Sequence, residues 1–168
     1  MSEIVIRYVK KEDLQAVTDV EASCFPAAEA APKEALQKRI ETFPECFFVA
    51  EHDGTIVGFI NGCATDERTI RDEMFEDSSL HQQDGRYQSI FGLDVIAEYR
   101  RQGIAARLMR TLIEDARKKG RDGLILTCKA RLIHYYETFG YRNLGVSGSV
   151  HGGAVWYDMI LEFGDSAE

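Results

Sequence analysis

The sequence lacks the patterns that mark secreted, metal-binding and membrane-spanning chains. Its four cysteines, Cys24, Cys46, Cys63 and Cys128, are scattered and show no C-x-x-C spacing, which argues against a zinc site and against a disulfide framework. No apolar run reaches the roughly 18 residues that suggest a membrane span. The N-terminus has no apolar segment of the length found in signal peptides. We therefore expect a cytoplasmic protein with reduced thiols, without a metal ion and without membrane contact.

Positive charge is also scarce. Lysine and arginine number 20 against 28 aspartates and glutamates, which gives a formal net charge of −8. Binding to nucleic acid needs a basic face, so this balance argues against a nucleic-acid partner. An acidic surface raises the local concentration of cations and would suit a cationic substrate such as an amine, although it serves solubility equally well.

The pattern of the 168 residues predicts one α/β domain over residues 1–163 and a frayed tail over 164–168. Apolar residues alternate at strand spacing or recur at helix spacing, and Asp53-Gly54 between two apolar runs signals a hairpin. The polar stretch 66–85 is expected to be a loop with one short helix. We expect strands near 4–8, 46–52, 55–64, 87–95, 123–128, 141–146 and 154–161, and helices near 10–24, 33–43, 102–119 and 132–139. The strand-helix-strand unit in the middle of this order should be parallel and right-handed.

The stretch 95–110 carries the strongest functional signal. An apolar strand runs into a short turn that opens a helix, and the turn holds Arg100, Arg101 and Gly103. The first N–H groups of a helix have no partner within it and lie at the positive end of its dipole, so they bind anions. Gly103 lets a phosphate approach the backbone, and arginine binds phosphate through two donors. The segment is predicted to bind a pyrophosphate. The alternative is an ordinary amphipathic helix whose basic first turn opposes its dipole.

Two motifs resemble one superfamily. The turn contains neither the G-x-G-x-x-G of dinucleotide-binding folds nor the P-loop pattern. Its R-x-x-G-x-A at 100–105 resembles the [RQ]-x-x-G-x-[GA] signature of the GNAT acyltransferases, and YYETFGY at 135–141 resembles their later FYe-x-x-GF motif. The two motifs stand in the expected order, about one strand apart.

Further segments resemble the arylalkylamine (serotonin) N-acetyltransferase branch of that superfamily. They are CFP at 24–26, FPECFFVAE at 43–51, VGFING at 57–62, DERT at 66–69 and LH at 80–81. One feature of that branch is missing. Its animal enzymes carry two histidines on the strand before the pyrophosphate turn, and the matching positions here are Ser89 and Phe91.

The resemblance implies the GNAT acyl-CoA N-acyltransferase fold, a mixed and mostly antiparallel sheet of about seven strands with flanking helices. It implies acetyl-CoA as cosubstrate and acetyl transfer to a primary amine of a small molecule, of aralkylamine or polyamine type, by direct attack through a tetrahedral intermediate. Tyr136 would stand beside the sulfur and protonate the leaving thiolate. The implied cofactor-binding residues are Leu93, Asp94 and Val95, through backbone atoms, and Arg100, Arg101, Gln102, Gly103, Ile104, Ala105 and Ala106 around the pyrophosphate.

Some alternatives stay open. The acceptor could instead be a protein N-terminus or lysine, and the domain could be a non-catalytic acyl-CoA sensor. Homodimers are common among similar enzymes but leave no mark in the sequence. Tyr136 shares one helix face with Leu132, Tyr135 and Phe139, as a core aromatic would.

The group that deprotonates the amine is also left open. An alkylammonium has a pKa near ~10 and must lose a proton before attack. A water chain that ends on Ser89 and the many carboxylates of the chain are candidates. The histidines are His52, His81, His134, which should point away from Tyr136, and His151, in a glycine-rich loop that often borders the acceptor pocket. The aromatic residues that could line such a pocket are Phe25, Phe75, Phe91 and Trp156.

Overall fold

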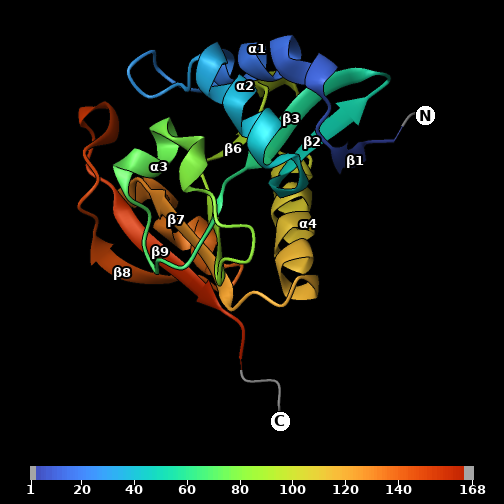
Figure 1. Ribbon diagram of the computed structural model, residues 1–168. Helices are drawn as coiled ribbons and strands as arrows, with labels where there is room; N and C mark the ends of the chain where they lie inside the picture. The colour runs from blue at the N-terminus through green and yellow to red at the C-terminus, as the bar shows by residue number, and fades with distance from the viewer. Residues whose placement is uncertain (1–2, 165–168) are drawn as a thin grey trace.

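The computed structural model describes residues 3–164 and shows two twisted sheets set at an angle to one another (Figure 1). The first sheet has the order β1-β2-β3-β6 and the second the order β4-β5-β7-β9-β8. All neighbouring pairs are antiparallel except β5 and β7, which are parallel. The strands are β1 (Val5–Tyr8), β2 (Phe47–His52), β3 (Thr55–Asn61), β4 (Ala64–Thr65), β5 (Tyr87–Ile90), β6 (Gly92–Val95), β7 (Gly123–Cys128), β8 (Arg142–Val146) and β9 (Tyr157–Glu162).

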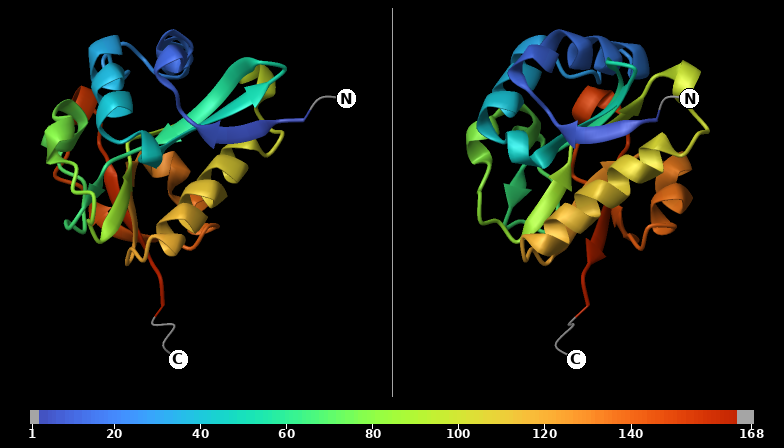
Figure 2. Two further views of the ribbon diagram at one scale, coloured as in Figure 1. Left: turned by 45° about the vertical axis from the view of Figure 1, so that its right-hand side comes forward. Right: turned by 90° about the vertical axis from the view of Figure 1, so that its right-hand side faces the viewer.

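Helices cover both faces of the first sheet. Helices α1 and α2 pack on one face through an apolar cluster with β2 and β3, and α4 packs on the other face and reaches β7 (Figure 2). The helices within residues 3–164 are α1 (Leu14–Cys24), α2 (Lys33–Thr42), α3 (Asp72–Glu76), α4 (Ile104–Lys118) and α5 (Ile133–Glu137). This arrangement confirms the predicted α/β class with a mixed, mostly antiparallel sheet.

Two predicted strands are each divided by an irregularity, which is why the structure has nine strands where about seven were expected. The strand expected at 55–64 breaks at Gly62, where a Cβ would overlap the backbone oxygen of Ser89, so only glycine fits. The strand expected at 87–95 breaks at Phe91, and its two halves join different sheets. Apolar spacing alone does not register such breaks, because both halves keep buried side chains.

The break at Phe91 creates the opening in which a ligand can lie. β5 pairs with the first part of β7, from Tyr87 opposite Gly123 to Ile90 opposite Leu126. Beyond that point, within residues 3–164, β6 pairs only with β3 and its other edge has no strand partner, while β7 continues with β9. The ends of β6 and β7 therefore separate.

Helix α4 begins and ends at glycines with left-handed backbone. Gly103 has φ +82° and precedes the first residue of α4, and Gly120, with φ +78°, follows its end. Leu108, Leu112 and Ala116 are fully buried on its inner face. The helix starts two residues later than predicted, because Gly103, inside the predicted range, has a left-handed backbone that an α-helix does not allow.

Other predicted boundaries need small corrections. The helix expected from residue 10 begins at Leu14, because the Asp13 carboxylate accepts the Lys10 N–H and ends a short 3-10 turn there. The helix expected at 132–139 is α5 after a 3-10 turn. The expected frayed tail lies, apart from Gly164, outside the described residues, and the single domain over 1–163 stays a prediction. None of the described helices combines the length and apolar character needed to cross a bilayer.

Candidate active site

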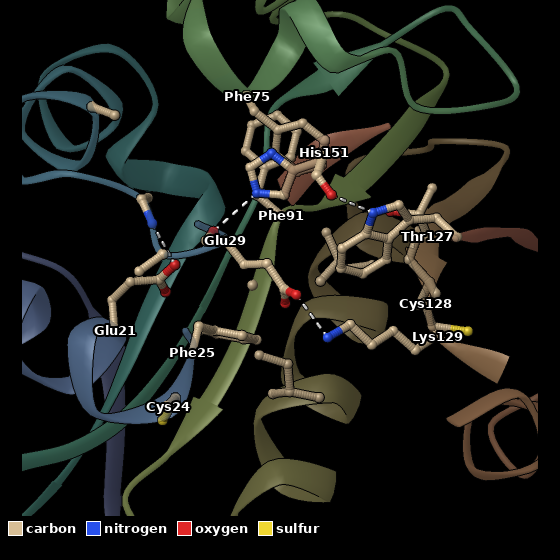
Figure 3. Close-up of a pocket in the computed structure, with 18 of the residues that line it drawn as sticks. Glu21, Cys24, Phe25, Glu29, Phe75, Phe91, Thr127, Cys128, Lys129 and His151 are labelled. Atoms are coloured by element: carbon tan, nitrogen blue, oxygen red, sulfur yellow. Dashed lines mark hydrogen bonds and ion pairs between the residues drawn. The ribbon is translucent and has the colours of Figure 1, made fainter. Parts of the chain in front are cut away.

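A cavity of about 630 Å³ opens between the separated ends of β6 and β7 (Figure 3). Its walls come from β6 and β7, from α1 and the loop that follows it, from α2 and α3, from the start of α5, and from the glycine-rich loop before β9. The segment around β6 contributes Ile90, Phe91, Gly92 and Leu93 to the lining. The cavity is thus built at the point where the sheet splits.

The free edge of β6 offers backbone groups to this cavity. Ile96 donates its N–H to Val57 of β3, and alternate residues of a strand direct their polar groups to opposite edges. Leu93 and Val95 therefore face away from β3. The Val95 carbonyl already accepts from the Arg100 Nε at 2.8 Å and from the Cys24 thiol at 3.5 Å. Leu93 is left as the residue whose backbone groups a bound chain can pair with.

The turn before α4 presents a row of free N–H groups. The first intrahelical bond there runs from the Arg107 N–H to the Gly103 carbonyl. Among the described residues, no N–H from 101 to 106 has an acceptor. A Cβ on Gly103 would meet nothing within 4 Å, so the space over the turn is open. These donors can surround an anion the size of a pyrophosphate.

In the predicted pyrophosphate segment, most side chains do not extend the row of backbone donors. Arg100 is exposed, but its guanidinium turns back onto Val95 and Cys24 and so holds the turn in shape. Arg101 and Gln102 are exposed, and Ile104 is buried in the core beneath α4. The structure thus leaves Arg101 as the side-chain cation at the turn, and the remaining residues offer backbone.

Tyr136 and Tyr135, which spacing could not separate, lie in different places. Tyr136 lines the cavity and packs edge-on against the ring of Tyr141, with the ring centroids 6.0 Å apart. Burial, with a smaller effect of Cys128, raises the pKa of the Tyr136 phenol, so that it stays protonated. Tyr135 is exposed and packs against Phe139. Tyr136 is therefore the tyrosine that can donate a proton into the cavity.

All four aromatic residues suggested as a pocket lining do line the cavity: Phe25, Phe75, Phe91 and Trp156. His151 lies among them, stacked on Phe75 with centroids 5.0 Å apart (Figure 3). Its Nε2 lies 2.9 Å from the Glu29 carbonyl, and the Trp156 indole donates to the His151 carbonyl. The loop before β9 is thereby fixed to the loop after α1.

Ser89 and three of the four histidines, which were also candidates for the amine's base, lie outside the cavity. Ser89 is fully buried, donates its hydroxyl to the Cys63 carbonyl and does not line the cavity, so a water chain cannot end on it there. His52 contacts the Tyr99 hydroxyl at 2.7 Å. The His134 side chain is 92% exposed, on the surface as its position suggested. Among the histidines, His151 alone borders the cavity.

His81 belongs to a partly buried cluster with Glu45 and Cys46, whose ligand atoms lie within 4.8 Å of one another. Its Nδ1 accepts the Ala64 N–H, so the neutral ring carries its hydrogen on Nε2, 3.5 Å from Glu45. Burial raises the pKa of the Cys46 thiol to about 12, which keeps the sulfur protonated. This donor set suits a hydrogen-bonded core better than a metal ion.

Sequence reasoning missed the acidic groups of the cavity. Glu21, only 6% exposed, lines it from the inner face of α1. Glu29 follows in the next loop, and its Oε2 lies 2.8 Å from the Lys129 ammonium at the end of β7. The sequence did contain one signal, a glutamate directly after Val20 on the apolar face of a predicted helix. Charged residues are rarely buried without a partner or a function, so Glu21 could have been singled out.

Comparison with known proteins agrees with this geometry. Residues 14–141 match the family described as "Acetyltransferase (GNAT) family". The chain is 30% identical over 142 residues to the "Probable hydrolase YhcX" of Bacillus subtilis (strain 168), covering 79% of this chain and 27% of that protein. It is 31% identical over 105 residues to "N-acetyltransferase 8" of Homo sapiens, covering 61% of this chain and 40% of that protein. The chain thus spans well under half of either relative.

Solved structures show the same fold. The structure described as "GphF GNAT-like decarboxylase in complex with isobutyryl-CoA" superposes with a TM-score of 0.82 over 94% of this chain and 98% of that one. At 21% sequence identity, this likeness shows the fold alone.

Proposed function

From the premise that this chain belongs to the acetyltransferase (GNAT) family, in the class of N-acetyltransferases, we propose that it transfers an acetyl group from acetyl-CoA to the primary amine of a small molecule. The GNAT fold predicted from the two motifs is confirmed. The single observation that carries the proposal is that Leu93 on the open edge of β6 and Tyr136 line one cavity. The free N–H groups of 101–106 follow β6 along the chain, at the turn that opens α4.

Acetyl-CoA would extend from the turn before α4 along β6 to Tyr136. Its pyrophosphate would accept the N–H groups of 101–106, with Arg101 as the nearby cation. The pantetheine arm would lie along β6 and pair with Leu93 as an added strand would. The thioester would then sit near Gly92 and Tyr136, and a backbone N–H of β6 would stabilise the oxyanion, an effect worth roughly 3 kcal/mol per donor in other acyl-transfer sites.

Tyr136 supplies the proton for the leaving thiolate. Because burial raises the pKa of its phenol, a free phenolate is disfavoured there. Tyr136 must therefore regain a proton from the attacking nitrogen as it gives one to the sulfur. Such positioned proton transfer contributes typically about 10²–10⁴-fold.

The shape and charge of the acceptor side favour a small amine. The loop after α1 and the loop before β9 meet over the cavity through His151 and Glu29, so the opening is not the flat groove that a protein substrate needs. Phe25, Phe75, Phe91 and Trp156 give this part an apolar wall, and Glu21 and Glu29 place carboxylates beside it. An aromatic surface with nearby carboxylates is suited to an alkylammonium with an apolar body, so we retain the aralkylamine or polyamine class.

A thiol-release assay with acetyl-CoA tests the proposal. The acceptors should be a set of aralkylamines, polyamines and short peptides with free N-termini or lysines. We expect release with at least one small amine and none above background with the peptides. Release with peptides alone would show a protein acetyltransferase. CoA binding without release for any acceptor would indicate an acyl-CoA sensor.

A further inference from the structure

Two carboxyl groups lie side by side at the floor of the cavity, Glu21 in its lining and Asp94 beneath it. Asp94 of β6 is 1% exposed, and neither of its side-chain oxygens has a donor among the described residues. Glu21 of α1 accepts the Ala31 N–H on Oε2 at 2.8 Å. Asp94 Oδ1 and Glu21 Oε1 lie 3.1 Å and 3.6 Å from the point that a Cβ on Gly92 would occupy. The missing side chain of Gly92 is what leaves room for both groups.

The charged surroundings of this pair come from three elements. Arg39 of α2 is buried nearby, but it donates to the Asn61 amide oxygen at 3.3 Å and to the Phe75 carbonyl at 3.0 Å. It forms no ion pair with either carboxylate within residues 3–164. Cys24 of α1 is the other titratable neighbour, and Asn61 is the contribution of β3. On its opposite face β6 meets apolar side chains of α4.

When two neighbouring buried carboxyl groups are both ionised, their negative charges repel, so the pair favours a state in which one of them is protonated. Burial, followed by the charge of Glu21 and a hydrogen bond to it, raises the pKa of Asp94 well above its usual value, and Arg39 only partly opposes this. A neutral Asp94 supplies the hydrogen that its unpartnered oxygens otherwise lack. Its hydroxyl then donates to a carboxyl oxygen of Glu21.

We propose that Glu21 is the catalytic residue that takes the proton from the acceptor ammonium, and that Asp94 is a positioning residue that holds Glu21 in place. The inference rests on the proposed amine acetylation and assigns its missing base. Glu21 lines the cavity, and its Oε1 lies 3.6 Å from the point that a Cβ on Gly92 would occupy. The thioester would sit beside this same glycine. Glu21 would contact the acceptor directly, whereas Asp94 acts only by positioning Glu21.

Every proton in this scheme can be followed from its donor to its acceptor. The ammonium gives its first proton to the Glu21 carboxylate, which passes it to solvent after the product leaves. The freed nitrogen lone pair then forms the bond to the thioester carbonyl carbon. The second proton leaves the nitrogen of the adduct and replaces the one that Tyr136 gives to the sulfur as the carbon–sulfur bond breaks. One proton is released for each amide formed.

Two competing groups in the cavity, Glu29 and His151, already have partners. The Glu29 carboxylate is paired with Lys129 at 2.8 Å. The Nε2 of His151 is held at 2.9 Å from the Glu29 carbonyl, and its ring is stacked on Phe75. Glu21 is the carboxylate at the strand split without a cationic partner among the described residues.

The test compares Glu21→Gln with the matched control Glu114→Gln, because Glu114 is also a helix glutamate but is exposed on α4 and does not line the cavity. With an amine that is charged at the assay pH, E21Q should lose about 100-fold or more in kcat, within the range of positioned proton transfer. With an amine that is largely neutral at that pH, the loss should be under about tenfold. E114Q should match the wild type, and calorimetry should show the same CoA affinity in all three proteins.

A carbon-13 NMR titration of the carboxyl groups gives a second readout that needs no activity. Asp94 should titrate above the usual aspartate range in the wild type and lower in E21Q, and Asp94→Asn should shift the pH profile of kcat/KM. Equal kcat and pH profiles for E21Q and the wild type would overturn the role of Glu21, as would an Asp94 that titrates normally. A wild type that acetylates no amine would instead overturn the proposed function.

Discussion

The ammonium of Lys129 lies 2.8 Å from the Glu29 carboxylate and joins the end of β7 to the loop after α1 across the cavity (Figure 3). Both side chains are largely buried, with 25% and 9% of their surfaces exposed. The pair neutralises two charges that an incoming amine would otherwise meet. Removing the charge of Lys129 and removing the charge of Glu29 should therefore change the affinity for a cationic acceptor in opposite directions.

We expect Lys129→Met to lower the KM for a cationic amine and Glu29→Gln to raise it, each by about three- to tenfold. A change of that size corresponds to roughly 1 kcal/mol, as expected for charges a few ångströms apart in a partly solvated site. Steady-state kinetics with one amine would measure this, with CoA affinity as the control. Shifts in the same direction would show that the ion pair acts by fixing the loop and not by its charges.

Replacing Tyr136 by phenylalanine should lower kcat at least roughly tenfold, because the thiolate loses its proton donor while the ring still packs against Tyr141. The affinity for CoA should stay within about twofold, which is a small change in free energy. Tyr135→Phe is the matched control, since that hydroxyl belongs to an exposed ring. Kinetics and calorimetry on both variants would check this. Full activity in Y136F would remove the phenol from the chemistry.

The pyrophosphate turn can be tested with two glycines that share one backbone conformation. Gly103 and Gly120 have φ +82° and +78°, and a Cβ on either would meet nothing within 4 Å. A glutamate at either position should cost a similar roughly 1–2 kcal/mol of stability for the left-handed conformation. Only Gly103→Glu should abolish CoA binding in calorimetry, because it places a negative charge over the free N–H groups. Normal binding by G103E would refute the turn as the pyrophosphate site.

The sequence predicted those parts of the site that depend on local patterns. The turn around Gly103 and the helix carrying Tyr136 are short segments whose spacing encodes their geometry, so they could be located without coordinates. The direction of a side chain is a different matter. Arg100 fits the signature, yet its Nε donates to the Val95 carbonyl on the edge of β6 that faces away from β3.

The parts that sequence missed arise from packing between distant segments. Phe91 looks like any apolar strand residue, and only the different partners of β5 and β6 show that the sheet splits there. Glu21 and Asp94 come from a helix and a strand far apart in the chain, and no periodicity connects them. Their pairing depends on α1 lying across β6, which is a tertiary contact.

The last prediction concerns Asp94 and the stability of the fold. Burial and the charge of Glu21 raise the pKa of Asp94 in the folded state. An acid of this kind contributes stability that is present below its unfolded pKa of about 3.9 and is lost as the pH rises through its folded pKa. Asparagine does not titrate. The free energy of unfolding of D94N, relative to the wild type, should therefore increase with pH above about 4.

Asp13→Asn provides a control of opposite sign. Burial alone would raise the pKa of Asp13, but hydrogen bonds from the Arg7 guanidinium and the Lys10 N–H lower it overall. Its stabilisation is present above about 3.9 and is lost as the pH falls through its folded pKa. Relative to the wild type, D13N should thus become less stable as the pH rises toward about 4. Urea unfolding across the pH range would measure both slopes. A D94N curve parallel to the wild type would mean that Asp94 is ionised in the folded protein, because a buried neutral acid must make stability depend on pH.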